Sequence, residues 1–194
     1  TDYYGSEPGY DALRERSAGA FERLSRLPIL TREQLSQNSL RMLTVPESGV
    51  QMTATSGTSG DPILFHLDRQ RGAAEWAYVF DAWHRAVSEE FTPGQQQTFE
   101  RVFPNAGISN FYGLSERTCF ASMDPDGTFH AEPLYGITEL LGEDGLPVEV
   151  GWRGRLVTTS LMIKGQPFLR YDTGDSAERV GTDAWGQPTF RAIS

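Results

Sequence analysis

The second half of the chain alternates short apolar runs with turns rich in glycine, proline and aspartate, and this pattern most restricts the fold. The stretch TELLGEDGLPVEVG, residues 138–151, predicts two strands around the GEDG turn, and GRLVTTSL, residues 154–161, predicts another strand. The sequence contains no internal repeat and no low-complexity segment. From Ile108 onward we therefore expect a strand-rich structure.

The first half has the spacing of helices. Apolar residues recur at roughly helical spacing over residues 10–27, and Pro28 ends this predicted helix because proline lacks the N–H that a helix needs. Thr31 and Gln34 form a capping-box pattern, which predicts the start of a second helix. A strong helix is predicted over residues 68–87, and a turn followed by another helix over residues 88–103.

Two predicted strands, residues 49–55 and 62–67, flank a loop of unusual composition. Together with the helices before them and the strands after them, they indicate a mixed α/β fold. The loop lies within TATSGTSGDP, residues 53–62, and combines two glycines with several hydroxyl side chains. The glycines would let backbone N–H groups converge on one anion. Phosphate binding and a plain connecting loop are both open on this stretch alone, and the spacing of a Walker loop is absent.

The composition excludes several classes of protein. With 38% hydrophobic and 22% charged residues the chain is ordinary for a globular protein, and its net charge of −9 argues against a nucleic-acid partner. No apolar run approaches the roughly 20 residues of a membrane span, and no signal peptide opens the sequence. The single cysteine, Cys119, cannot form an internal disulfide. We therefore expect a cytoplasmic protein without nucleic-acid or membrane partners.

Two further stretches carry candidate chemistry. In NFYGLSE, residues 110–116, an aromatic ring could cover a planar base, Gly113 could let a ligand approach the backbone, and Glu116 could hold a hard cation such as Mg²⁺. In PFLRYDTGD, residues 167–175, the last aspartate is suited to accept hydrogen bonds from two sugar hydroxyls. Each stretch taken singly is also compatible with an ordinary turn.

The stretches TSGTSGDP, YGLSE and RYDTGD, in this order, resemble the signature motifs of the adenylate-forming superfamily of acyl-coenzyme A synthetases, peptide-synthetase adenylation domains and luciferases. The flanking segments LPILTREQL and RLVTTSLMIKGQPF, and the lack of a lysine after Pro62, are most similar to the phenylacetate–coenzyme A ligase branch and related capsule-biosynthesis proteins. The resemblance runs through nearly the whole chain. It implies part of the superfamily's large N-terminal α/β domain, with mixed sheets flanked by helices and a small β-rich subdomain.

The resemblance also implies a nucleotide site. The hydroxyl-rich loop would hold the β- and γ-phosphates of ATP, Tyr112 would stack on adenine, Asn110 would read the adenine edge, Glu116 would bind Mg²⁺ and Asp175 would bind the ribose. The implied nucleotide-binding residues are Thr55, Ser56, Gly57, Thr58, Ser59, Gly60, Asn110, Tyr112, Gly113, Ser115 and Asp175, with Glu116 as metal ligand and with Glu116 and Thr58 as catalytic residues.

The implied reaction has two steps. A substrate carboxylate attacks the α-phosphorus of ATP to give acyl-AMP and pyrophosphate, and the thiol of coenzyme A or of a carrier protein then displaces AMP. A carboxylate is already ionised at neutral pH, so the first step needs no general base. We therefore expect the three histidines to pack or to lie on the surface; they are His66, His84 and His130.

The substrate implied by this branch is a small carboxylic acid, with an aryl acid favoured, although amino acids and hydroxy acids are handled by related folds. Four apolar residues could line its pocket, but core packing is the more usual role for such side chains. They are Trp83, Phe111, Phe120 and Met123.

The sequence departs from this family in two places. Relatives carry a long stretch where Val87 is followed directly by Ser88, and the lysine-bearing C-terminal domain of the family is absent from these residues. We divide the chain into residues 1–87, with the N-terminal helices and the phosphate loop, and residues 88–194, with the nucleotide-binding and β-rich part of the same domain. If Val87 and Ser88 are truly joined, we expect weak nucleotide binding without unaided adenylation.

Three hypotheses therefore compete. The chain is part of an ATP-dependent acid ligase, whether as the retained portion of a longer enzyme or as an engineered fragment. Alternatively, it is a natural truncated relative that binds nucleotide or acts as a scaffold without catalysis. A plain interaction module, in which the three loops are only turns, predicts no affinity for ATP.

Overall fold

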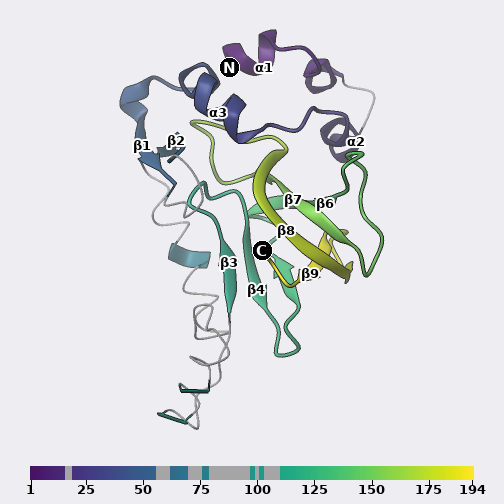
Figure 1. The fold of residues 1–194 in the computed structure, drawn as a ribbon. Coiled ribbons are helices and arrows are strands. Elements are labelled where there is room, and N and C mark those ends of the chain that lie inside the picture. The colour runs from purple at the N-terminus through teal and green to yellow at the C-terminus, as the bar shows by residue number, and fades with distance from the viewer. Residues whose placement is uncertain (16–18, 56–61, 70–75, 79–96, 99–100, 103–109) are drawn as a thin grey trace.

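Short helices make up the first part of the chain and strands the last part in a computed structural model, which describes residues 1–15, 19–55, 62–69, 76–78, 97–98, 101–102 and 110–194 (Figure 1). The α-helices and the 3-10 helices, the latter labelled η, are α1 Asp2–Ser6, η1 Asp11–Arg14, α2 Ala20–Ser25, α3 Arg32–Asn38, η2 Ser39–Met42 and η3 Glu47–Gly49. The strands are β1 Val50–Ala54, β2 Leu64–Asp68, β3 Phe111–Gly113, β4 Phe120–Met123, β5 Phe129–Ala131, β6 Gly136–Leu141, β7 Arg153–Ser160, β8 Tyr171–Thr182 and β9 Pro188–Arg191. The expected mixed α/β fold is confirmed.

The described strands form two sheets. β1 and β2 pair as an antiparallel hairpin, and the other strands form a seven-stranded antiparallel sheet in the order β3-β4-β5-β9-β8-β7-β6. The helices α1, α2 and α3 gather at one end of this sheet, and the β1–β2 hairpin stands beside them (Figure 1). The strands predicted over residues 49–55, 62–67 and 154–161 are confirmed as β1, β2 and β7.

Two sequence predictions differ from the structure. The helix expected over residues 10–27 is replaced by two short helices, η1 and α2. The backbone adopts an extended conformation directly after Arg14 and again at Gly19, the N-cap of α2. The second strand expected in residues 138–151 is reduced to one bridge between Leu141 and Pro147. Pro147 has no N–H to donate, so a regular ladder cannot continue through it.

The predictions over residues 68–103 fall mostly outside the described residues. Within that range Trp76–Tyr78 and residues 97–98 are helical, as are residues 101–102 at its end. The capping box predicted at the second helix is confirmed, because the Thr31 hydroxyl accepts the Gln34 N–H and the Gln34 side chain accepts the Thr31 N–H. Across the described part of the chain, no helix is long and apolar enough to cross a membrane.

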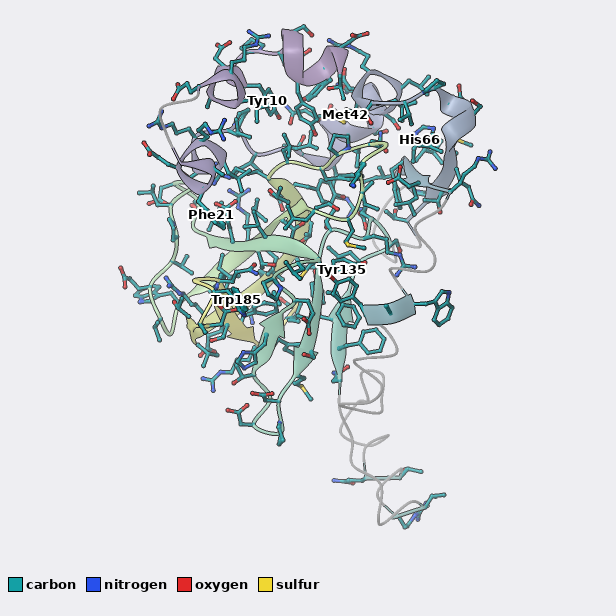
Figure 2. All side chains as sticks on the ribbon, turned by 180° about the vertical axis from the view of Figure 1, so that it is seen from behind. Tyr10, Phe21, Met42, His66, Tyr135 and Trp185 are labelled. Atoms are coloured by element: carbon teal, nitrogen blue, oxygen red, sulfur yellow. The ribbon has the colours of Figure 1, made fainter. Side chains whose placement is uncertain are left out.

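The buried apolar residues form two main cores. The first core lies under the helices and joins them to the β1–β2 hairpin and to the segment before β8; its members include Tyr4, Leu30, Phe65, Phe168 and Tyr171. Tyr10 and Met42, both in this core, lie among the helices in Figure 2. The second core lies within the seven-stranded sheet; its members include Tyr112, Cys119, Leu140, Leu156 and Phe190.

One arginine ties the helices to the sheet. Arg170 has a positive φ of 49° immediately before β8, and its buried guanidinium forms an ion pair with Glu139 of β6, with Nε 3.0 Å from Oε2. The same guanidinium donates to the carbonyl oxygens of Ser25 and Leu27 at 2.8 and 2.6 Å. Beside it, Leu30 forms a parallel bridge with Tyr171. These contacts fix where β8 begins, and therefore fix the third sequence motif against the first core.

Candidate functional site

The hydroxyl-rich loop closes the β1–β2 hairpin. The Thr55 N–H donates to the Ile63 carbonyl at 3.1 Å, and the Ile63 N–H donates to the Thr55 hydroxyl oxygen at 3.1 Å. Thr55 is buried, so its side chain braces the base of the loop. The other predicted loop residues, Ser56 to Gly60, lie outside the described residues. The prediction that this loop binds phosphate stays a prediction.

The second motif forms the edge strand β3 and the turn that follows it. Tyr112 is 8% exposed, and its ring meets Phe190 of β9 edge-on at 6.3 Å between centroids. Gly113 is exposed, with no atom closer than 3.9 Å to the position that a Cβ would take. The Asn110 Oδ1 atom is buried and has no hydrogen-bond partner within the described portion of the chain. A buried acceptor without a donor is costly, so this atom points to a missing hydrogen-bond donor.

Glu116 lies in the turn between β3 and β4, one residue before Arg117, which has a positive φ of 57°. Although it is a carboxylic acid, Glu116 is only 3% exposed. Its Oε1 accepts the phenol O–H of Tyr171 at 2.7 Å. Within the described residues no second hydrogen bond to this carboxylate is present, which leaves Oε2 as a possible ligand atom.

The third motif supplies a matching pair. Asp175 of β8 accepts the phenol O–H of Tyr112, with the two oxygens 2.6 Å apart, and its own N–H donates to the Thr173 hydroxyl at 3.1 Å. Each motif thus contains a tyrosine and an acid four residues later, and the structure pairs them crosswise. Tyr112 of the second motif binds Asp175 of the third, and Tyr171 of the third binds Glu116 of the second.

Electrostatics keep both tyrosines as donors. Burial raises the pKa of Tyr112 and of Tyr171, and the acid beside each phenol raises it further, through Asp175 and Glu116 respectively. Both phenols are therefore protonated at neutral pH and donate to their carboxylates. An O–H donor to a carboxylate forms a strong, oriented hydrogen bond.

The donor set at Glu116 suits Mg²⁺ better than a transition metal. Within the described residues there is no cluster of three or more His, Cys, Asp or Glu side chains that could hold a metal ion. Mg²⁺ does not need such a cluster, because it keeps several waters and binds through one or two carboxylates together with substrate phosphates. One carboxylate with an oxygen left over therefore fits this ion.

Most of the other residues predicted from the sequence make packing or hydrogen-bond contacts within the protein. Phe111 stacks on Phe120 at 5.4 Å between centroids, and Met123 packs against the second core, which agrees with a packing role. His66 is buried with Nδ1 3.1 Å from the Ser39 hydroxyl, and His130 lies 3.1 Å from Asp124 at the surface, as expected. Ser115 is half-buried between Gly113 and Glu116. Trp83, His84 and the Val87–Ser88 junction lie outside the described residues.

A hollow of about 280 Å³ lies elsewhere, where α2 meets the turns of the large sheet. Phe21 and Trp185 both line it, and both side chains lie on the same side of the molecule in Figure 2. None of the residues predicted from the three motifs lines this hollow. It is therefore separate from the candidate nucleotide site.

Sequence reasoning overlooked Tyr171. Within RYDTGD the motif pattern indicates a role for the final aspartate alone. A usable signal was present, because Tyr171 and Asp175 have the same spacing as Tyr112 and Glu116. Equal spacing does not reveal that the pairs cross, since that depends on how the turn after β3 meets the start of β8.

Comparisons with known proteins give matches among solved structures. No protein-family model matches the chain, and no curated protein matches it. A structure of 2-hydroxyisobutyryl-CoA ligase in the postadenylation state, in complex with R3-HIB-AMP, matches with a TM-score of 0.66 and 13% identity, covering 97% of this chain and 60% of that chain. The same ligase with 2-HIB-AMP and CoA in the thioesterification state matches with a TM-score of 0.62 and 14% identity, with the same coverage.

An open conformation of that ligase, with 2-HIB-AMP and CoA, matches with a TM-score of 0.61 and 13% identity, covering 89% of this chain and 64% of that one. The chain thus spans less than two thirds of the length of the structures that it matches. At these identities the likeness concerns the fold and not the activity. The chain therefore shares, in part, the mixed α/β fold of 2-hydroxyisobutyryl-CoA ligase.

Proposed function

We propose that this chain is the nucleotide-binding part of an ATP-dependent acid ligase that activates a carboxylic acid as acyl-AMP. The observation that carries the proposal is the crossed pairing of Tyr112 with Asp175 and of Tyr171 with Glu116, which brings the second and third motifs together. This pairing occurs on a fold shared with a ligase whose structures contain 2-HIB-AMP and CoA.

The adenosine end of ATP would lie along β3 and the middle of β8. The buried Asn110 Oδ1 atom lacks a donor among the described residues, and the amino group of adenine is such a donor. Asp175 uses Oδ2 for the Tyr112 phenol, so its other oxygen would accept from the ribose hydroxyls. Tyr112 is largely buried, so adenine would stack only on the part of its ring that reaches the surface.

The phosphates would lie toward the loop at the tip of the β1–β2 hairpin. Thr55 to Gly60 would hold the β- and γ-phosphates through N–H and hydroxyl groups, with Thr58 as a catalytic residue. Glu116 would hold Mg²⁺, which when bound supplies positive charge beside the triphosphate. The loop contains no lysine or arginine, so this charge must come from outside it.

The reaction would join a carboxylate oxygen to the α-phosphorus while the bond from that phosphorus to pyrophosphate breaks. The carboxylate is already ionised, so the residues of the site would position the reactants and stabilise charge without removing a proton. A thiol, such as that of coenzyme A or a carrier protein, would then attack the acyl carbon and release AMP.

The substrate would be a small carboxylic acid. The resemblance to the phenylacetate–coenzyme A ligase branch favours an aryl acid, and the structural match to a ligase for a hydroxy acid makes hydroxy acids the next class to test.

Residues 1–87 and 88–194 would act as two segments of one domain. In support, the first core contains Leu30 and Phe65 from the first segment and Phe168 and Tyr171 from the second.

Binding of ATP by the 194-residue chain tests the proposal. Calorimetric titration with ATP should give binding that strengthens when Mg²⁺ is added, and Glu116→Gln should abolish that strengthening because a neutral amide is a poor Mg²⁺ ligand. Glu143→Gln, the same chemical change at an exposed turn between β6 and β7, is the matched control and should behave as the unmodified chain. Absence of any ATP binding would instead favour the plain interaction module.

Exchange of labelled pyrophosphate into ATP separates a ligase from a non-catalytic relative, because only an adenylating enzyme scrambles the label. We expect acid-dependent exchange from a protein that also carries the lysine-bearing domain, and ATP binding without exchange from these 194 residues alone. A panel of aryl, hydroxy and amino acids would identify the substrate class. If none of the acids in the panel supports exchange, the non-catalytic alternative is favoured.

A further inference from the structure

Tyr171 donates a hydrogen bond to Glu116 but is not itself among the residues proposed to contact the nucleotide. Tyr171 is fully buried, belongs to the first core, and packs edge-on against Phe168 at 5.4 Å between centroids. Its backbone is held on both sides, by the bridge to Leu30 and by pairing with Thr158 of β7. Its phenol oxygen is therefore a fixed point in the molecule.

Glu116 depends on this fixed point. It lies in a turn, where the backbone alone constrains a long side chain poorly, and it is 3% exposed. A buried carboxylate needs hydrogen-bond donors, and among the described residues its only donor is the Tyr171 phenol, 2.7 Å from Oε1. With one oxygen held in this way, the direction of the other is set.

The second pair, Tyr112 and Asp175, is also a phenol that donates to a carboxylate, but it lies in another part of the molecule. Tyr112 belongs to the second core, and its phenol holds Oδ2 of the partly exposed Asp175 at 2.6 Å. The two acids are therefore held from different cores. Each motif supplies the tyrosine that donates a hydrogen bond to the acid of the other motif.

We propose that Tyr171 is a positioning residue that orients Glu116 toward a divalent cation, and that Tyr112 likewise orients Asp175 toward the ribose of the nucleotide. This inference rests on the proposed function, since it names the residues that prepare that site. Hydrogen-bonded partners of a metal ligand commonly change metal affinity or activity by about 10- to 100-fold when they are removed.

The test compares Tyr171→Phe with Tyr4→Phe. Tyr4 is a matched control because it is also buried in the first core, and its phenol donates to the Pro167 carbonyl at 2.7 Å instead of to an acid of the site. ATP affinity is measured by calorimetry with Mg²⁺ and with a chelator, and thermal unfolding is measured for each variant. Tyr171→Phe should weaken Mg²⁺-dependent ATP binding about tenfold or more and leave the chelated value nearly unchanged. Tyr4→Phe should change neither value.

Two further variants sharpen the assignment. Tyr112→Phe should weaken binding of AMP in the presence of chelator, where no metal contributes, because only the orientation of Asp175 is disturbed. Tyr171→Phe introduced into the Glu116→Gln background should cause no further loss of ATP affinity, with or without Mg²⁺, because a positioning residue acts only through the group that it positions. An additional loss in that background would mean that Tyr171 acts by another route.

The binding measurements distinguish failure of the positioning role from failure of the proposed function. If the unmodified chain binds no nucleotide, the proposed function fails and the inference fails with it. If the chain binds ATP with Mg²⁺ but Tyr171→Phe matches Tyr4→Phe, or weakens both conditions equally, only the positioning role is overturned. Should Tyr171→Phe not fold, Glu116→Asp takes its place: the shorter acid keeps its charge but withdraws from the phenol, and full Mg²⁺ dependence in that variant would overturn the role.

Discussion

The two cores of this molecule are assembled in different ways. The second core joins strands that are mostly neighbours along the chain, such as β3 with β4 and β6 with β7. The first core joins the N-terminal helices to a segment far away in sequence; the Tyr4 phenol, for example, binds the Pro167 carbonyl 163 residues later. The difference shows that the candidate site depends on non-local contacts, because Tyr171, which holds Glu116, belongs to the first core.

The largest expected effect comes from cutting the link between the helices and the sheet. Arg170→Met leaves Glu139 without its partner and two carbonyl oxygens without a donor, so we expect the free energy of unfolding to fall by about 3–5 kcal/mol. Urea unfolding monitored by circular dichroism measures this loss. Arg191→Met, which removes an exposed ion pair with Glu178, is the control and should have little effect. Equal losses in the two variants would mean that the buried pair does not join the two cores.

A smaller effect is expected within the first core alone. Thr31→Ala removes the cap of α3 and should lower the free energy of unfolding by about 1 kcal/mol, whereas Thr31→Ser should retain most of it. Hydrogen exchange measured by mass spectrometry should locate the loss in α3 and leave β6 and β7 protected. If β6 and β7 also lost protection, the two cores would unfold as one unit and the contrast between them would not hold.

The last and smallest expected effect concerns the buried thiol of the second core and appears at alkaline pH. Burial raises the pKa of the Cys119 thiol to about 11, so the folded chain should resist alkylation by iodoacetamide near pH 8, and the chain in guanidinium chloride should react readily. Because this pKa is higher in the folded state than in the unfolded state, the thiol stabilises the fold below about pH 9. That contribution is lost as the pH rises toward 11.

Comparison with Cys119→Ala isolates this contribution. The variant should show a shallower decline of stability between about pH 9 and pH 11 than the unmodified chain, with the buried tyrosines contributing equally to both. Rapid alkylation of the native chain near pH 8 would mean that the second core opens more easily than its packing suggests.

The sequence predicted the local parts of this structure and missed the non-local ones. The strand β7 and the capping box of α3 follow from patterns only a few residues long, and both are confirmed. The helix expected over residues 10–27 is wrong because the spacing of its apolar residues says nothing about where the chain turns. Its Phe21 is in fact exposed and faces the hollow beside α2.

The candidate site divides in the same way. The motifs predict the candidate residues Asn110, Tyr112, Glu116 and Asp175. In the structure, Tyr112 pairs with Asp175, and Glu116 pairs with Tyr171, which the motifs did not indicate. Their crossing could not be predicted, because it depends on Arg170 and Leu30 setting the start of β8 against the first core. Local patterns identify which groups are present, whereas tertiary contacts decide which groups meet.

The long reach of Arg170 has a consequence for how the protein is made. Its bonds to Ser25 and Leu27 span 145 and 143 residues, so the helices α1 to α3 cannot complete their core until Arg170 has been synthesised. At translation rates of about 5–20 residues per second, that interval is roughly 7–30 s. During this time the tyrosines and leucines near the N-terminus remain uncovered. The nascent chain therefore offers chaperones an apolar N-terminal segment that the finished protein conceals.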